Sequence, residues 1–335
     1  MTNAISTKNL GRGGPSVSSI GLGCMAMSDV YAAPDEDAGV RTIHAAMDAG
    51  ITMLNTGDFY GTGRNELLVG RAIKGKRDRA FIAVKCGALR TPGGGYSGFD
   101  MRPQAMKNWV AHSLSRLGTD YIDLYQPSRV DPQVPIEDTI GALADLVKEG
   151  WIRHIGMSEA GPESLRRAHA VHPIAAHEVE YSLFGRGIED TILPVCRELG
   201  IATVAYSVLA GGLLGGNYRP NAAEASMREA LPRYQAGNVE KNLGLVDRLK
   251  VVAADRGVSI ATLAIAWVAA SGSDVIPLVG VRKPERLSDA LAATTFQLSP
   301  SDLSAIEEAC PRSAVAGTQY SGLVQTMIEA ERAKQ

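Results

Sequence analysis

Short apolar runs alternate with amphipathic stretches along the whole chain. Eight of these runs have the length of strands and are apolar on both faces, which is typical of parallel strands buried beneath helices. They span residues 21–25, 52–54, 81–84, 121–125, 152–157, 175–179, 202–207 and 275–279. Helix and strand patterns alternate without a break in composition, so the sequence predicts an α/β fold, one closed (β/α)8 TIM barrel, rather than two open sheets.

Helical patterns fill the gaps between these runs. Asp35 is expected to cap a helix that extends to Gly50, and Pro103 stands at the start of a helix that ends near Leu117. Further helices are predicted over residues 64–73, 136–149, 161–169, 188–199, 240–256 and 284–293.

Three features lie outside the repeat. They are an N-terminal hairpin around Gly13 and Gly14, an extra helix over 259–270 and a C-terminal segment after Pro300. The predicted fold is therefore a barrel with an N-terminal hairpin and extra C-terminal helices.

We expect one barrel domain over residues 1–335. Its two long connections, 86–101 and 208–238, follow strands and are predicted to form loops at the catalytic mouth, with residues 310–335 as a C-terminal tail.

Composition narrows the class of protein. The 335 residues are 45% hydrophobic and 21% charged, with a net charge of -2, so no overall basic field favours nucleic acid or an anionic membrane. No run approaches the roughly 18 apolar residues of a membrane helix, and we expect a cytoplasmic protein. Four scattered cysteines suit reduced, buried thiols, and no metal site is expected: Cys24, Cys86, Cys196 and Cys310.

Polar side chains follow the predicted strands, where a barrel of this kind carries its chemistry. Lys85 ends an apolar strand, and a cation at a barrel mouth needs a partner unless its side chain reaches solvent. Tyr60 follows the adjacent strand and is a candidate neighbour, although simple packing would also explain it. A nearby ammonium would lower the pKa of the Tyr60 phenol and make it a better acid.

The segment after the last strand is basic. Arg282, Lys283 and Arg286 flank Pro284, which suits the first turn of a helix whose amides attract phosphate. A solvated helix start explains the same charges, but the position after strand eight favours phosphate. The glycine-rich residues 211–216 follow strand seven, where backbone amides can approach a pyrophosphate.

Several motifs together resemble the aldo-keto reductase superfamily, from Leu22 to at least Leu291. Residues 54–61 (LNTGDFYG) are similar to the family's strand-two signature, and 121–126 (YIDLYQ) to its strand-four signature. Later segments in the family's order are 155–158 (IGMS), 180–183 (EYSL), 205–207 (AYS) and 276–277 (IP).

The resemblance implies a carbonyl reductase in which NADPH gives hydride and a tyrosine protonates the carbonyl oxygen. Tyr60 matches that acid and Lys85 its partner, but Asn55 stands at the usual aspartate position and Ser128 at the usual histidine position. Asn55 supplies no negative charge, so Lys85 should have a lowered pKa or borrow a carboxylate such as that of Asp58.

Ser128 is shorter than imidazole and does not titrate near neutrality. Water, Gln126 or a residue of the long loops could act in its place. Each such change would cost on the order of 10- to 1000-fold in rate, judged from the removal of single oxyanion donors.

The resemblance also implies a set of NADPH contacts. Glu159 and Glu178 replace the usual asparagine and glutamine; both can accept from the nicotinamide carboxamide, but neither can donate. Arg282, Lys283 and Arg286 match the positions that bind the 2′-phosphate, which favours NADPH over NADH. The full predicted set is Ser158, Glu159, Glu178, Tyr206, Ser207, Leu209, Gly211, Leu213, Gly280, Arg282, Lys283, Arg286 and Asp289.

The leading hypothesis is an NADP-dependent oxidoreductase of small carbonyls or the corresponding alcohols, a monomer or small homo-oligomer. A cofactor-binding regulatory or interaction subunit with weak turnover is the second, and a barrel isomerase or lyase without nicotinamide is the third. Candidate substrate-wall residues are Tyr96, Phe99, Trp109 and Tyr125.

Overall fold

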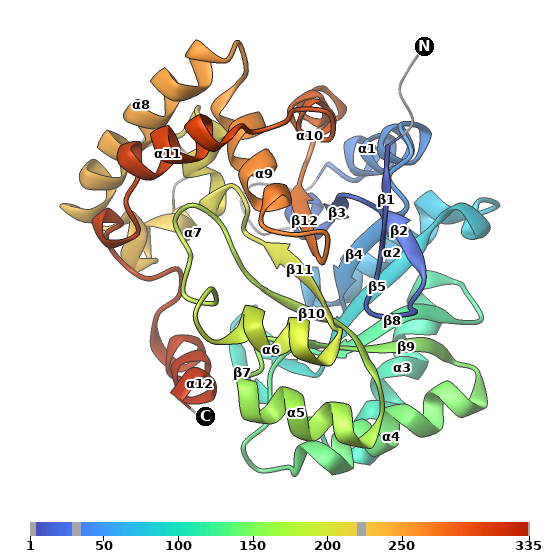
Figure 1. Cartoon of the computed structure of the whole chain (residues 1–335). Helices are drawn as coiled ribbons and strands as arrows, with labels where there is room; N and C mark the ends of the chain where they lie inside the picture. The colour runs from blue at the N-terminus through green and yellow to red at the C-terminus, as the bar shows by residue number, and fades with distance from the viewer. Residues whose placement is uncertain (1–4, 29–34, 220–225, 334–335) are drawn as a thin grey trace.

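The computed structural model describes residues 5–28, 35–219 and 226–333. Eight parallel strands close into one barrel, in which strands neighbour one another in chain order and β12 returns to β3 (Figure 1). The predicted (β/α)8 TIM barrel is thereby confirmed. The barrel strands are β3 (Gly21–Gly23), β4 (Met53–Gly57), β5 (Phe81–Cys86), β8 (Ile122–Pro127), β9 (Ile152–Ser158), β10 (Ile174–Glu180), β11 (Ala202–Tyr206) and β12 (Val275–Gly280).

A ring of helices surrounds the barrel. Asp35 caps the first of them, and its carboxylate accepts from the Ala38 amide at 2.9 Å. The ring consists of α1 (Glu36–Asp48), α2 (Arg64–Ile73), α3 (Pro103–Leu117), α4 (Ile136–Glu149), α5 (Pro162–Val171), α6 (Ile192–Leu199), α8 (Asn238–Asp255) and α10 (Leu287–Ala293).

Two predicted helix starts were wrong. Helix α6 begins at Ile192 rather than at residue 188, because Pro194 has no N–H to donate to the preceding turn and fits only the first turn of a helix. The predicted helix over 284–293 opens instead with the 3-10 turn η6 (Pro284–Arg286), and α10 follows it.

The N-terminal hairpin is confirmed as the antiparallel pair β1 (Thr7–Asn9) and β2 (Ser16–Ser18). Leu10 and Val17 are buried in the apolar cluster inside the barrel, so the hairpin region closes the N-terminal end of the strands. Other elements are α9 (Ile260–Ala270), α11 (Pro300–Ala309), α12 (Gly322–Ala333), α7 (Ser226–Glu229), η1 (Met25–Met27), η2 (Tyr60–Gly63), η3 (Arg77–Arg79), η4 (Ala210–Gly215), η5 (Pro232–Tyr234) and η7 (Arg312–Ala314).

The long connections carry structure that the hydrophobic pattern did not predict. Residues 86–101 contain the hairpin of β6 (Ala88–Arg90) and β7 (Tyr96–Phe99). Residues 208–238 contain η4, α7 and η5, and 220–225 of this predicted loop lie outside the described residues, as do 334–335 of the predicted tail. The domain bounds themselves stay a prediction.

Within the described ranges, no single helix is both long and apolar enough to cross a membrane. Helices α8 and α9 satisfy that test only as a pair, across a bend of 87°.

Candidate active site

The inward-facing side chains of the barrel form an apolar layer below a polar one. The apolar layer includes Met53, Ala83, Leu124, Ala176 and Val204. Side chains alternate across a strand, so the residue two positions further on points the same way, nearer the C-terminal end. The residues reached in this way are Asn55, Lys85, Gln126, Glu178 and Tyr206. Five strands therefore direct polar side chains into the mouth of the barrel.

The Lys85 ammonium has a carboxylate partner. Its Nζ lies 2.9 Å from Oε1 of Glu178, donates to Oδ1 of Asn55 at 2.5 Å, and donates to the Thr56 carbonyl at 3.2 Å. Both members of the ion pair are almost fully buried. Both outcomes that the sequence left open are found: the pKa of Lys85 is lowered, and its ammonium borrows a carboxylate, which comes from Glu178 rather than from Asp58. Oδ2 of Asp58 instead accepts from the Gly87 amide at 3.1 Å.

Two amides orient the Glu178 carboxylate. Its Oε2 accepts from Nδ2 of Asn55 at 2.7 Å and from Nε2 of Gln126. Gly156 on β9 leaves room for Gln126, because a Cβ at that position would lie 2.7 Å from Oε1 of Gln126. Gln126, which the sequence left as a substitute for the usual histidine, is therefore engaged with Glu178.

Tyr60 lies directly beside this ion pair. The Lys85 Nζ is 5.1 Å from the centre of the Tyr60 ring, and Phe59 packs edge-on against that ring at 4.8 Å. Burial raises the pKa of the Tyr60 phenol well above its ordinary value, and the Glu178 charge raises it further. The expectation of a lowered pKa was wrong, because desolvation is the largest effect and the Glu178 charge adds to it. Tyr60 therefore stays protonated and keeps a hydroxyl to donate.

The pKa of Lys85 is lowered by burial, and Glu178 opposes that shift. A buried ammonium without a partner would lose its proton still more readily. The ion pair therefore maintains the positive charge beside Tyr60.

Ser128 occupies the buried position at the end of β8, and its hydroxyl has no hydrogen-bond partner within the described residues. The next residue, Arg129, was not singled out from the sequence. Its guanidinium donates to the Ser128 carbonyl and lies 5.9 Å from the centre of the Tyr320 ring. Sequence position after a barrel strand was the signal that could have identified Arg129. Nothing in the hydrophobic pattern placed Tyr320, from the C-terminal tail, at the mouth.

Glu159, which directly follows β9, also has a cationic partner. Its carboxylate lies 3.3 Å from Nη2 of Arg332 and accepts from the Tyr206 hydroxyl at 2.7 Å. Tyr320 donates to the Tyr206 hydroxyl at 3.0 Å, so this chain of contacts joins the tail to the mouth. Each acid predicted to stand near the nicotinamide, Glu159 and Glu178, is thus paired with a cation.

The predicted nucleotide side combines an unusual backbone with unsatisfied polar atoms. Ser158 at the end of β9 has a buried hydroxyl without a partner in the described chain. Ser207 and Gly212 have positive φ values of 56° and 111°, and a Cβ on Gly211 would lie 2.3 Å from the Tyr234 hydroxyl oxygen. Within this tight turn the Gly212 amide donates to the Leu209 carbonyl at 2.8 Å. Leu209 and Leu213 belong to the same segment.

The basic cluster follows β12. Gly280 and Lys283 are exposed, and the Arg286 guanidinium is exposed beside Asn217, whose side-chain oxygen accepts from it at 3.0 Å in the favoured amide orientation. Arg282 is half-buried. The Asp289 carboxylate accepts from the Ser259 hydroxyl at 2.7 Å, which ties α10 to the start of α9.

Tyr125 is not a wall of the substrate site. Its side chain is fully buried in the cluster between strands and helices, because odd and even positions of β8 face opposite sides. Tyr96 lies above the site, 6.0 Å from the Phe59 ring, while Phe99 packs against the outer core. Trp109 donates to the Asp100 carbonyl at 3.1 Å and supports the end of the β6–β7 hairpin.

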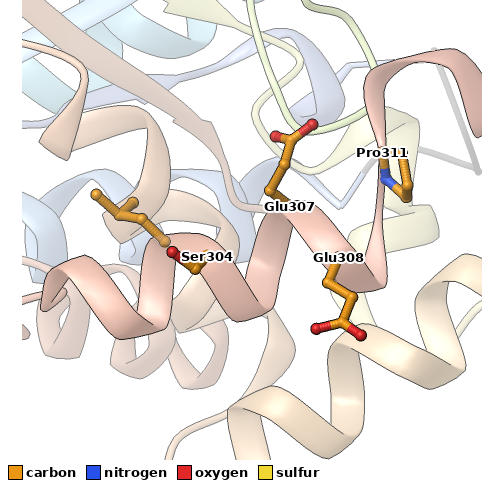
Figure 2. A pocket seen from close by; sticks show the side chains of 5 residues that line it. Ser304, Glu307, Glu308 and Pro311 are labelled. Atoms are coloured by element: carbon orange, nitrogen blue, oxygen red, sulfur yellow. The ribbon is translucent and has the colours of Figure 1, made fainter.

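Two hollows lie on the surface of the described residues. One is an open depression along α11, lined by Ser304, Glu307, Glu308 and Pro311 (Figure 2). The other, of about 230 Å³, lies between the loop after β10 and the tail, and its walls include Glu180, Arg233, Tyr320 and Arg332. The first contains none of the strand-end side chains, whereas the second borders the mouth.

Asp58 makes folding stability depend on pH. Burial raises the pKa of its carboxyl from 3.8 to about 7. Between these values the unfolded chain releases the proton while the folded chain keeps it, so this group lowers stability as pH rises. We expect Asp58→Asn to gain stability relative to the parent protein as pH rises from 5 to 8, by at most about 3 kcal/mol, because about two pH units of this window lie below the folded-state pKa and each is worth 1.36 kcal/mol. Urea unfolding at both pH values measures this change, and parallel pH dependence in the two proteins would contradict it.

Residues 19–310 match the Aldo/keto reductase family. The chain is 42% identical over 324 residues to a probable aldo-keto reductase 1 from Glycine max, covering 96% of this chain and 93% of the relative. The chain therefore belongs to the aldo/keto reductase family.

Solved structures agree in fold. A glycerol dehydrogenase from Gluconobacter oxydans superposes with a TM-score of 0.84 at 31% identity, covering 95% of this chain and 98% of its own. An aldo/keto reductase from Klebsiella pneumoniae, solved with NADP and acetate, has a TM-score of 0.71 at 26% identity, with coverage of 95% and 98%.

Proposed function

We propose that this protein is an NADPH-dependent oxidoreductase that reversibly converts an aldehyde or ketone into an alcohol. The observation that carries the proposal is the position of Tyr60: a protonated phenol lies beside a buried, ion-paired Lys85 at the C-terminal mouth of the barrel. Such a phenol can donate its proton to a carbonyl oxygen as negative charge develops there. Lys85 is held close enough to stabilise the phenolate that remains.

The residues present fit the nucleotide. The Ser158 hydroxyl, which has no hydrogen-bond partner among the described residues, would bind the carboxamide, and the Tyr206 ring would stack on the nicotinamide. The tight turn, with positive φ at Gly211 and Gly212, would let the backbone approach the pyrophosphate closely. Arg282 and Arg286 would hold the 2′-phosphate, the group that distinguishes NADPH from NADH. When bound, NADPH supplies the hydride.

The two acids at the mouth support this reading. Glu159 is paired with Arg332 and Glu178 with Lys85, so neither leaves an uncompensated negative charge beside the neutral nicotinamide. The Klebsiella pneumoniae relative, which holds NADP, provides independent support for the same cofactor.

A steady-state assay tests the proposal. The purified protein should oxidise NADPH with some members of a panel of aldehydes and ketones, and should reduce NADP with the corresponding alcohols. Absence of turnover in both directions, with NADPH binding confirmed by fluorescence, would reject the enzyme reading.

The second candidate is an NADPH-binding subunit with weak or no turnover, and Ser128 is the observation that favours it. A short hydroxyl, without a hydrogen-bond partner in the described part of the chain, stands where the family resemblance implies an imidazole that orients the substrate. Tight NADPH binding that is unaffected by Tyr60→Phe, with no turnover before or after the change, would support this candidate.

A further inference from the structure

We infer that Glu178 is the carboxylate that holds the Lys85 ammonium in place. In this protein the negative charge stands at Glu178 on β10, whereas the family resemblance implies it at position 55 on β4, where this chain has Asn55. Glu178 acts through Lys85 and is a positioning residue. The inference rests on the proposed function for its kinetic consequences. Its structural core, a single buried ion pair, can be tested without turnover.

The geometry makes positions 55 and 178 depend on each other. The Asn55 amide uses both ends: its oxygen accepts from Lys85 and its nitrogen donates to Glu178. Aspartate at position 55 could not donate to Glu178 and would place two carboxylates in contact. Glutamine at position 178 would leave the buried ammonium without an anion. The pair Asn55 and Glu178 is therefore self-consistent, whereas either substitution alone is not.

The contact crosses the barrel interior. Lys85 lies on β5 and Glu178 on β10, and two strands, β8 and β9, separate them around the wall. Gln126, from the intervening β8, adds a second amide donor to Glu178. The carboxylate thus receives donors from β4, β5 and β8 and has little freedom to turn away from Lys85.

No other nearby titratable group replaces this charge. Burial raises the pKa of the Cys24 thiol to about 12, so it is neutral near pH 7. Tyr60 is also protonated, as described above. Arg129 is positive and lowers the pKa of Lys85. Within the described part of the chain, Glu178 is the carboxylate in contact with the Lys85 Nζ.

The test is a charge-exchange series: Glu178→Gln, Asn55→Asp and the double variant. Glu178→Gln should lower kcat for carbonyl reduction roughly 10- to 1000-fold, the range seen when one group that stabilises charge is removed. As pH rises, its activity should also begin to fall at a lower pH than that of the parent protein, because Lys85 loses its proton more easily. The double variant should regain kcat to within about tenfold of the parent, whereas Asn55→Asp alone should not raise activity.

A second measurement follows the Lys85 charge directly. Carbon-13 NMR of labelled lysine, with Lys85→Met used to assign the signal, gives the Lys85 pKa in the cofactor-free protein. We expect this pKa to fall by about one unit or more in Glu178→Gln and to recover in the double variant. Asp123→Asn is the matched control: it breaks a 2.7 Å ion pair with Arg77 at the opposite end of β8 and should leave the Lys85 pKa unchanged.

The outcomes separate the inference from the proposed function. An unchanged Lys85 pKa in Glu178→Gln, or a double variant no better than that single variant, would overturn the inference. If Glu178→Gln does not fold, the kcat and the Lys85 pKa of the double variant still test the inference, because that variant again contains one carboxylate beside Lys85. The expected titration shifts in a protein without turnover would support the ion pair and reject the proposed activity.

Discussion

Tyr60→Phe is expected to lower kcat for carbonyl reduction by roughly 100- to 10,000-fold, the usual contribution of a positioned general acid. The phenol is the protonated group next to the buried ion pair, and phenylalanine keeps the ring contacts with Phe59 and Lys85 while removing the hydroxyl. NADPH affinity should change little, since the hydroxyl is not among the proposed nucleotide contacts. Single-turnover kinetics with saturating NADPH measures the chemical step.

Tyr181→Phe provides the control for that change. Tyr181 is buried and hydrogen-bonds Glu189 and Ser271 rather than the mouth residues. Its variant should lose some stability but keep the rate of hydride transfer. Equal rates in Tyr60→Phe and in the parent protein would show that Tyr60 is not the proton donor.

Arg286→Ala is expected to raise the Kd for NADPH roughly 10- to 100-fold and to leave the Kd for NADH nearly unchanged. The exposed guanidinium follows β12, where the proposed site holds the 2′-phosphate, and a hydrogen bond to a charged group contributes about 1.5–3 kcal/mol. Fluorescence titration with both nucleotides measures this difference.

Arg71→Ala is the matched control, because it removes an exposed guanidinium that pairs with Glu36 and Asp37 on the outer helices. It should leave both affinities unchanged. An equal loss of NADPH and NADH affinity in Arg286→Ala would place the 2′-phosphate elsewhere.

The strands were the most predictable part of the molecule. Buried parallel strands are apolar on both faces, and this continuous pattern marked all eight barrel strands to within a few residues. Polar residues at the strand ends were easy to recognise because they interrupt these apolar runs. The β6–β7 hairpin was missed because its sequence is rich in glycine and exposed, and therefore lacks an alternating apolar face.

The partner of Lys85 could not be predicted from spacing. Asp58 was the candidate because it follows the strand adjacent to that of Lys85, and strand order predicts contacts between neighbouring strands only. Glu178 is 93 residues from Lys85 and meets it only because barrel closure brings β10 opposite β5. The same limit applies to Tyr320, whose contact with Tyr206 depends on how the tail returns to the mouth.

The pKa of Tyr60 was predicted in the wrong direction for a related physical reason. A pairwise view of Tyr60 and Lys85 includes their attraction but omits the cost of burying a phenolate and the repulsion from Glu178. Those terms depend on burial depth and on a third residue, and both became visible only in three dimensions.

Transfer of deuterium from NADPH labelled at nicotinamide C4 tests the central claim most directly. The protein is incubated with the labelled nucleotide and a carbonyl compound that proved active in the panel, and the alcohol is analysed by mass spectrometry. We expect one deuterium at the former carbonyl carbon of the alcohol, and with Tyr60→Phe very little alcohol in the same time. Alcohol formed without deuterium from either face of the labelled nicotinamide would contradict direct hydride transfer.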